Sequence, residues 1–103
     1  QEVKAFAVAA YPDDYSMQQF IYDKQFSAKG YMATVVDTDV KSIALQEYPK
    51  DYSMQQFVYD KQLSAKGYMA RLSDGVEKQN AIRQYPKDYA MQKYIYDQTM
   101  SRR

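Results

Sequence analysis

One ten-residue phrase occurs three times in this chain of 103 residues, and it constrains the fold more than any other feature. It reads YPDDYSMQQF from Tyr11, YPKDYSMQQF from Tyr48 and YPKDYAMQKY from Tyr85, so each copy begins 37 residues after the one before. Repeats of about this period are typical of chains in which one small unit stacks on the next. The sequence therefore predicts three tandem units, which are residues 1–37, 38–74 and 75–103.

The first two copies are nearly identical, and the third is more divergent. Residues 11–33 and 48–70 differ only in the pairs Asp13/Lys50, Ile21/Val58 and Phe26/Leu63. The last two pairs are apolar exchanges that a core tolerates. What the divergent third copy keeps is more informative about packing, and it keeps Tyr85, Pro86, Asp88, Tyr89, Met91, Gln92, Tyr96 and Asp97.

Each unit contains a short segment and a long segment, and both have the periodicity of a helix. In the short segment the spacing i, i+3, i+4, i+7 is filled by Val3, Phe6, Ala7 and Ala10, and again by Val40, Ile43, Ala44 and Glu47. This spacing places all four side chains on one helical face. Asp37 or Thr38 is expected to cap the second short helix at its start.

A proline separates the two segments of every unit, at Pro12, Pro49 and Pro86. Proline is tolerated in the first turn of a helix but cannot continue a preceding one. An acidic residue just after it, such as Asp14, favours the positive end of the next helix dipole. We therefore expect a Tyr-Pro corner between two helices, with the first long helix running from about Asp13 to Val35.

The long helix should have apolar contacts on two sides. Its broad apolar face is expected to contain Met17, Phe20, Ile21, Ala28, Tyr31, Met32 and Val35. A second strip contains Tyr15, Tyr22, Phe26 and Ala33, with Gln18, Gln25 and Lys29 between the two. Gly30 and Gly67 each cost about 1 kcal/mol of helix propensity relative to alanine, so they mark a close helix approach or a kink.

The predicted fold is all-α, in a single domain of tandem repeats spanning residues 1–103. The pattern leaves two arrangements open, a compact helical bundle and a short helical-repeat stack. No apolar run is long enough to span a membrane.

The corner phrase resembles a motif in short, exported bacterial proteins of unknown function. That motif is Trp or Tyr, then Pro-Asp-Asp, an aromatic residue, any residue, and Met-Gln, and the match is YPDDYSMQQF from Tyr11. Lys50 and Lys87 depart from it. The resemblance implies an exported bacterial chain and no particular activity. Because the chain begins with Gln1 rather than methionine, we also expect a removed signal peptide and a secreted or periplasmic location.

Composition argues against several classes of function. The chain has no histidine and no cysteine, which removes Ser-His and Cys-His nucleophiles and the usual zinc ligands. We therefore expect no metal, no cofactor and no enzymatic activity. A carboxylate-dependent hydrolase is a distant alternative, because Asp13 and Asp14 are better explained as the start of a helix. The net charge of only +1 argues against nucleic-acid binding.

One polar stripe is the candidate site. Gln18, Tyr22 and Gln25 lie at i, i+4 and i+7 of the first long segment. The pattern recurs at Gln55, Tyr59 and Gln62, and at Gln92 and Tyr96 with Thr99 in the last position. Buried, these amides would form a Gln-Tyr ladder between helices; exposed, they would bind a partner. The sequence leaves both interpretations open.

Large apolar side chains near the two ends of the chain are candidates for self-association: Phe6, Tyr94, Ile95 and Met100. Exposed apolar faces on a repeat array mark interaction sites. The predicted function is accordingly non-catalytic, by binding a protein or another ligand or by self-association. The alternative is a structural subunit of an extracellular filament or layer.

Overall fold

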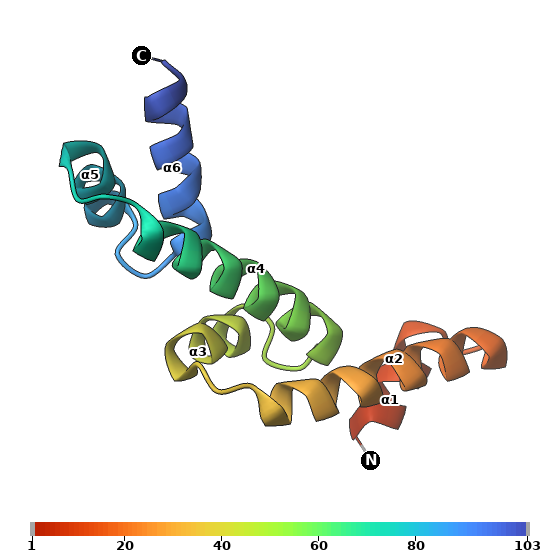
Figure 1. Cartoon of the computed structure of the whole chain (residues 1–103). Coiled ribbons are helices and arrows are strands. Elements are labelled where there is room, and N and C mark those ends of the chain that lie inside the picture. The colour runs from red at the N-terminus through yellow and green to blue at the C-terminus, as the bar shows by residue number, and fades with distance from the viewer. Residues whose placement is uncertain (1, 103) are drawn as a thin grey trace. The chain divides into compact units, whose positions relative to one another are not determined.

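A computed structural model describes residues 2–102, and all regular structure within that range is helical. Short and long helices alternate along the chain (Figure 1). They are α1 (Glu2–Ala10), α2 (Tyr15–Thr34), α3 (Thr38–Glu47), α4 (Tyr52–Arg71), α5 (Val76–Gln84) and α6 (Tyr89–Ser101). The prediction of an all-α chain is confirmed.

Aspartate side chains fix where four of these helices begin, namely α2, α3, α4 and α6. Asp14 Oδ1 accepts a hydrogen bond of 3.1 Å from the backbone N–H of Met17, and Asp88 Oδ1 makes the same bond with Met91. Such N-caps satisfy one of the four N–H groups that a helix leaves unpaired at its start. Asp37 caps α3 in the same way, through the N–H of Val40 at 3.0 Å, which confirms the cap expected there.

The corner differs in one respect from the expectation. The helix α2 begins at Tyr15, with Asp14 as its N-cap, so Pro12 lies ahead of the helix and not in its first turn. The N–H of Asp14 bonds to the carbonyl of Tyr11 at 3.4 Å, which closes a turn with proline in its second position. The expected start at Asp13 was wrong because the aspartate cap, rather than the proline, sets the helix boundary.

The chain divides into two compact units, residues 1–57 and 58–103, and the boundary falls within α4. These two structural units, called the first and the second unit below, are not the three tandem units predicted from the sequence. In the first unit α1 packs against α2. Its buried apolar side chains are Val3, Ala7, Ala28, Met32, Val40 and Ala44. Val3, Ala7, Val40 and Ala44 are members of the predicted short-helix faces, so that part of the core was predicted correctly.

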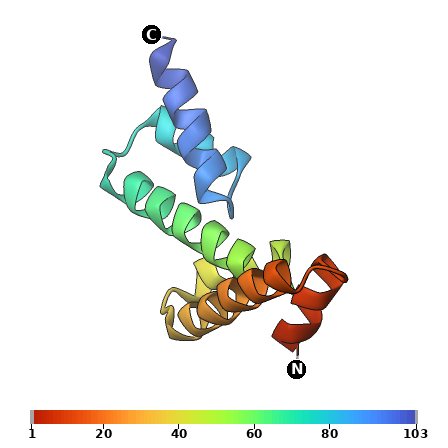
Figure 2. The ribbon, with the colours of Figure 1, turned by 90° about the vertical axis from the view of Figure 1, so that its right-hand side faces the viewer.

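In the second unit α5 packs against α6, as Figure 2 shows. The buried apolar side chains of this unit are Val58, Tyr59, Ala65, Met69 and Ala81. Two of these five side chains are the small ones of Ala65 and Ala81.

The broad apolar face expected on α2 was partly wrong. Phe20 is 56% exposed, whereas Gln25, which was placed between two apolar strips, is 3% exposed. Gly30 does not mark a close approach, because a Cβ built there meets no atom within 4 Å. No helix among the described residues is long and apolar enough to cross a membrane.

Candidate functional site

The glutamines of the predicted stripe act at the Tyr-Pro corners. Gln18, Gln55 and Gln92 lie near the start of the long helices, and each donates from Nε2 across its own corner. The acceptors are the carbonyl groups of Tyr11, Tyr48 and Tyr85, at 2.7 Å in all three cases. Gln55 and Gln92 are buried and Gln18 is half-buried. Each amide therefore holds the end of a short helix against the long helix that follows it.

Gln25 and Gln62 lie about two helical turns further along than Gln18 and Gln55, and they reach a different corner. Gln25 Nε2 donates to Asp51 Oδ1 at 2.8 Å, and its Oε1 accepts from the N–H of Tyr52 at 2.8 Å. One amide thus binds both the capping carboxylate and a first-turn N–H of α4. It thereby ties the middle of one long helix to the start of the next.

The same arrangement occurs 37 residues later, in the second unit. Gln62 Nε2 donates to Asp88 Oδ1 at 2.8 Å, and its Oε1 accepts from the N–H of Ala90 at 3.2 Å. Both amides are buried, where a hydrogen bond to a charged acceptor is worth more than in water. We call these two sets of contacts the amide links: Gln25 with Asp51 and Tyr52, and Gln62 with Asp88 and Ala90.

The carboxylate of Asp51 is held in its charged form by this network. Burial raises the pKa of Asp51, but the donors around the carboxylate outweigh that effect, so its pKa lies below the usual value. These donors are the Gln25 amide, the Met54 N–H and the Ser53 hydroxyl. A hydrogen bond to the charged form always favours that form.

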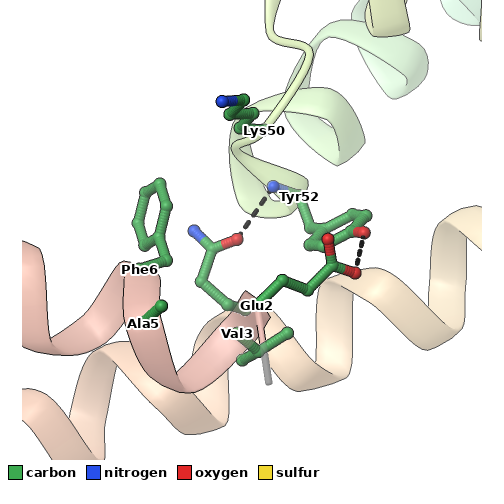
Figure 3. A pocket seen from close by; sticks show the side chains of 7 residues that line it. Glu2, Val3, Ala5, Phe6, Lys50 and Tyr52 are labelled. Carbon is green, nitrogen blue, oxygen red and sulfur yellow. Dashed lines mark hydrogen bonds between the residues drawn. The ribbon is translucent and has the colours of Figure 1, made fainter.

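A second group of contacts lies beside the first amide link (Figure 3). The Tyr52 hydroxyl donates to the carboxylate of Glu2 on α1, and Lys29 Nζ lies 3.1 Å from the same carboxylate. Lys29 Nζ is also 5.9 Å from the centre of the Tyr52 ring. Two contacts lower the pKa of Glu2: the hydrogen bond from Tyr52, which has the larger effect, and the contact with Lys29. The same bond raises the pKa of Tyr52.

Glu2, Gln25 and Tyr52 border a hollow of about 460 Å³ in the first unit. Figure 3 shows Phe6 and Lys50 at its edge. Gln25 also lines the hollow and accepts a hydrogen bond from the N–H of Tyr52. The lining mixes an aromatic ring with a carboxylate, an amide and an ammonium group. Such a mixture suits contact with a polypeptide better than enclosure of a small apolar molecule.

The tyrosines of the predicted stripe have different environments. Tyr59 is buried, whereas Tyr22 and Tyr96 are half-buried. The ring of Tyr22 stacks on that of Phe26 with centroids 5.9 Å apart. In the second unit a tyrosine outside the stripe, Tyr68, donates to Asp97 Oδ1 at 2.7 Å, which raises the pKa of Tyr68.

The four residues proposed for self-association also differ in exposure. Tyr94 and Met100 on α6 are exposed, whereas Phe6 on α1 and Ile95 on α6 are half-buried. Phe6 borders the hollow in Figure 3.

Sequence reasoning named Tyr94 and Met100 as exposed candidates but missed that each belongs to a series of exposed apolar side chains on the long helices. Phe20, Phe57 and Tyr94 are 56%, 57% and 55% exposed, and each lies 37 residues from the next. Phe26, Leu63 and Met100 form a second such series, at 57%, 41% and 37%. The available signal was that both positions stay large and apolar in the divergent third copy.

The acidic groups of the corners do not resemble a hydrolytic pair. Asp14, Asp51 and Asp88 each accept a backbone N–H at the start of a helix. Within residues 2–102 no three carboxylates gather in an arrangement that would hold a metal ion. No family model, curated protein or solved structure matches the chain.

Proposed function

We propose that this chain is a non-catalytic, exported helical-repeat protein that binds a protein partner. The observation that carries the proposal is the pair of exposed apolar series on the long helices: Phe20, Phe57 and Tyr94, and Phe26, Leu63 and Met100. Transfer of one such side chain out of water is worth about 1.5–3 kcal/mol, so side chains of this kind serve as anchors in interfaces. The exported location is supported by the resemblance of the corner phrase to exported bacterial proteins.

The architecture we propose is three copies of one unit, in which a short helix, a Tyr-Pro corner and a long helix recur. Two recurrences support it. The corner bond from glutamine to the tyrosine carbonyl occurs at 2.7 Å in all three copies. The amide link to the following aspartate occurs twice at 2.8 Å. A duplicated unit presents the same anchor several times, which raises avidity for an extended or repetitive partner.

A structural subunit of a filament or layer is the second candidate. The amide links favour it, because each joins one long helix to the start of the next long helix, and such a contact propagates if it also forms between molecules. Thr99 argues against a filament, since threonine occupies in the third copy the position that Gln25 and Gln62 occupy in the preceding copies. Its hydroxyl donates to the carbonyl of Ile95 within α6.

Partner capture with a matched variant tests the binding function. The intact chain and a variant with Phe20→Ser, Phe57→Ser and Tyr94→Ser are immobilised in parallel and exposed to extract of the native source. A protein retained by the first and not by the second is then purified and titrated into both by calorimetry. We expect the variant to bind at least tenfold more weakly, because three anchors are removed. Equal affinities of a purified partner for the two chains would refute the proposal.

Sedimentation velocity separates the two candidates. A binding protein stays monomeric as its concentration rises, whereas a filament subunit grows into species of increasing size. The triple variant serves here as well, since loss of assembly in that variant would assign the exposed series to contacts between copies.

A further inference from the structure

The three long helices begin in different surroundings, although their sequences there are alike. Tyr15 at the start of α2 is 82% exposed, whereas its counterparts Tyr52 and Tyr89 are half-buried. The difference arises from what lies against them. A preceding long helix contacts the starts of α4 and α6, through the two amide links described above.

The segment that makes this contact has the same sequence in both cases except at its second position. It reads Gln-Phe-Ser-Ala-Lys in residues 25–29 and Gln-Leu-Ser-Ala-Lys in residues 62–66. Its glutamine, alanine and lysine lie at i, i+3 and i+4, which places them on one helical face.

The three residues of this face make different contacts with the helix start. The glutamine binds the capping aspartate, and the alanines Ala28 and Ala65 are buried. The lysine lies over the first tyrosine ring, at 5.9 Å for Lys29 on Tyr52 and 5.5 Å for Lys66 on Tyr89. A cation at this distance from a ring is attracted to its face.

The start of α2 presents the same receiving groups. Asp14 caps the helix as Asp51 and Asp88 do, and Tyr15 occupies the place of Tyr52 and Tyr89. Beside Tyr15 lies a hollow of about 410 Å³ between α1 and α2, bordered by Ala7, Val8 and Gln18. Lys4 also borders this hollow, but Asp13 adds a second carboxylate at a position where the later copies have lysine. Because Asp13 and Asp14 outnumber that one ammonium group, a cationic partner is favoured here.

We propose that the start of α2 is a docking site for a helix of another polypeptide that carries glutamine, alanine and lysine at i, i+3 and i+4. Its glutamine amide binds Asp14 and a first-turn N–H, its alanine allows close approach, and its lysine covers the Tyr15 ring beside Asp13. Two equivalent helix starts in the same chain already hold this ligand. The inference rests on the proposed binding function and names a partner chemistry for it.

The test uses a peptide with the α4 sequence of residues 52–71 as the probe. The peptide carries Ser64→Lys, and a lactam between Asp60 and the new lysine holds it helical. Both positions lie on the side of the helix away from the docking face. It is titrated into the intact, isotope-labelled chain, and the backbone amide signals are followed by NMR. We expect shifts concentrated in residues 13–18. A peptide with Gln62→Ala and Lys66→Ala should bind about tenfold more weakly, as should the chain variant Asp14→Asn.

Asparagine at position 14 still caps a helix, so that variant removes the charge and keeps the fold. Equal binding of the two peptides, shifts centred on another helix, or the lack of any shift at millimolar peptide would each overturn the docking site. The chain carrying Phe20→Ser, Phe57→Ser and Tyr94→Ser should bind the peptide normally. Failure of the peptide alone therefore removes the docking site, whereas failure of the triple variant to lose its partner removes the proposed function.

Discussion

Gln19 and Gln25 lie on the same helix, and each donates from Nε2 to an aspartate Oδ1 at 2.8 Å. The two bonds differ in their surroundings. Gln19 is exposed and its partner Asp23 is one turn away, whereas Gln25 is buried and its partner Asp51 begins another helix. The pair therefore allows the value of the amide link to be measured against a chemically identical bond in solvent.

Replacing Gln25 by alanine removes three hydrogen bonds: those that Gln25 donates to the charged Asp51 and to the Ser53 hydroxyl, and the one that it accepts from the N–H of Tyr52. A bond to a charged group contributes about 1.5–3 kcal/mol and a neutral one about 0.5–1.5 kcal/mol, so we expect the three lost bonds to lower the free energy of unfolding by roughly 2.5–6 kcal/mol. Gln19→Ala loses a solvent-exposed i, i+4 contact and should cost about 0.5 kcal/mol or less. In a chain of this size the difference corresponds to a melting temperature lower by about 10 °C or more.

Urea unfolding followed by circular dichroism gives the two free energies, and hydrogen exchange adds a local readout. The Tyr52 N–H should exchange faster in Gln25→Ala, since its acceptor is gone, and should be unchanged in Gln19→Ala. If the two variants unfold at the same urea concentration, the amide link contributes nothing to stability and the reasoning is wrong.

Further predictions concern single groups. Gly30→Ala should raise stability by up to about 1 kcal/mol in thermal unfolding, because the added methyl group meets no atom; a loss would show an unseen constraint. Since the pKa of Asp51 is lowered by folding, its contribution is present above its unfolded pKa and is lost as pH falls through the folded one; Asp51→Asn should flatten stability curves measured below about pH 4. The pKa of Tyr52 is raised, so its contribution is lost as pH rises beyond about 10, and Tyr52→Phe should remove that alkaline decline. Tyr59→Phe should lower the melting temperature more than Tyr15→Phe, since Tyr59 is buried and Tyr15 exposed; equal values would contradict this.

Local signals in the sequence were sufficient for the helices and for part of the core. The spacing of Val3 and Ala7, and of Val40 and Ala44, correctly placed all four in the interior. The Asp37 cap was also correct. Such features depend on residues within one or two turns of each other, so a period or a capping residue reveals them.

The candidate site could be predicted only in part, because its defining contacts are long-range. The stripe containing Gln25 was visible, but its partner Asp51 lies 26 residues away, and no local rule joins the two. Hydrophobicity alone then assigned Phe20 to the core in preference to Gln25. The amide is buried because the start of another helix supplies both a carboxylate and an N–H, and the ring is left outside.

Substitution of Thr99 tests directly whether an amide link can also form between two molecules of this chain. It occupies the position of Gln25 and Gln62 in the third copy, and its exposed hydroxyl bonds only within α6 among the contacts described for it. Thr99→Gln would restore the amide of the link on α6, while the start of α2 on a second molecule presents Asp14.

We therefore expect Thr99→Gln to strengthen self-association by about tenfold, the value of one hydrogen bond to a charged acceptor. Sedimentation velocity over a range of concentrations measures the change. Thr99→Ala controls for loss of the hydroxyl, and adding Asp14→Asn to Thr99→Gln should return the chain to its original behaviour. Should Thr99→Gln sediment like the original chain at every concentration, the amide link would be confined to contacts within one molecule. A filament built on it would then be excluded, and the exposed aromatic series would remain as the surface available to a partner.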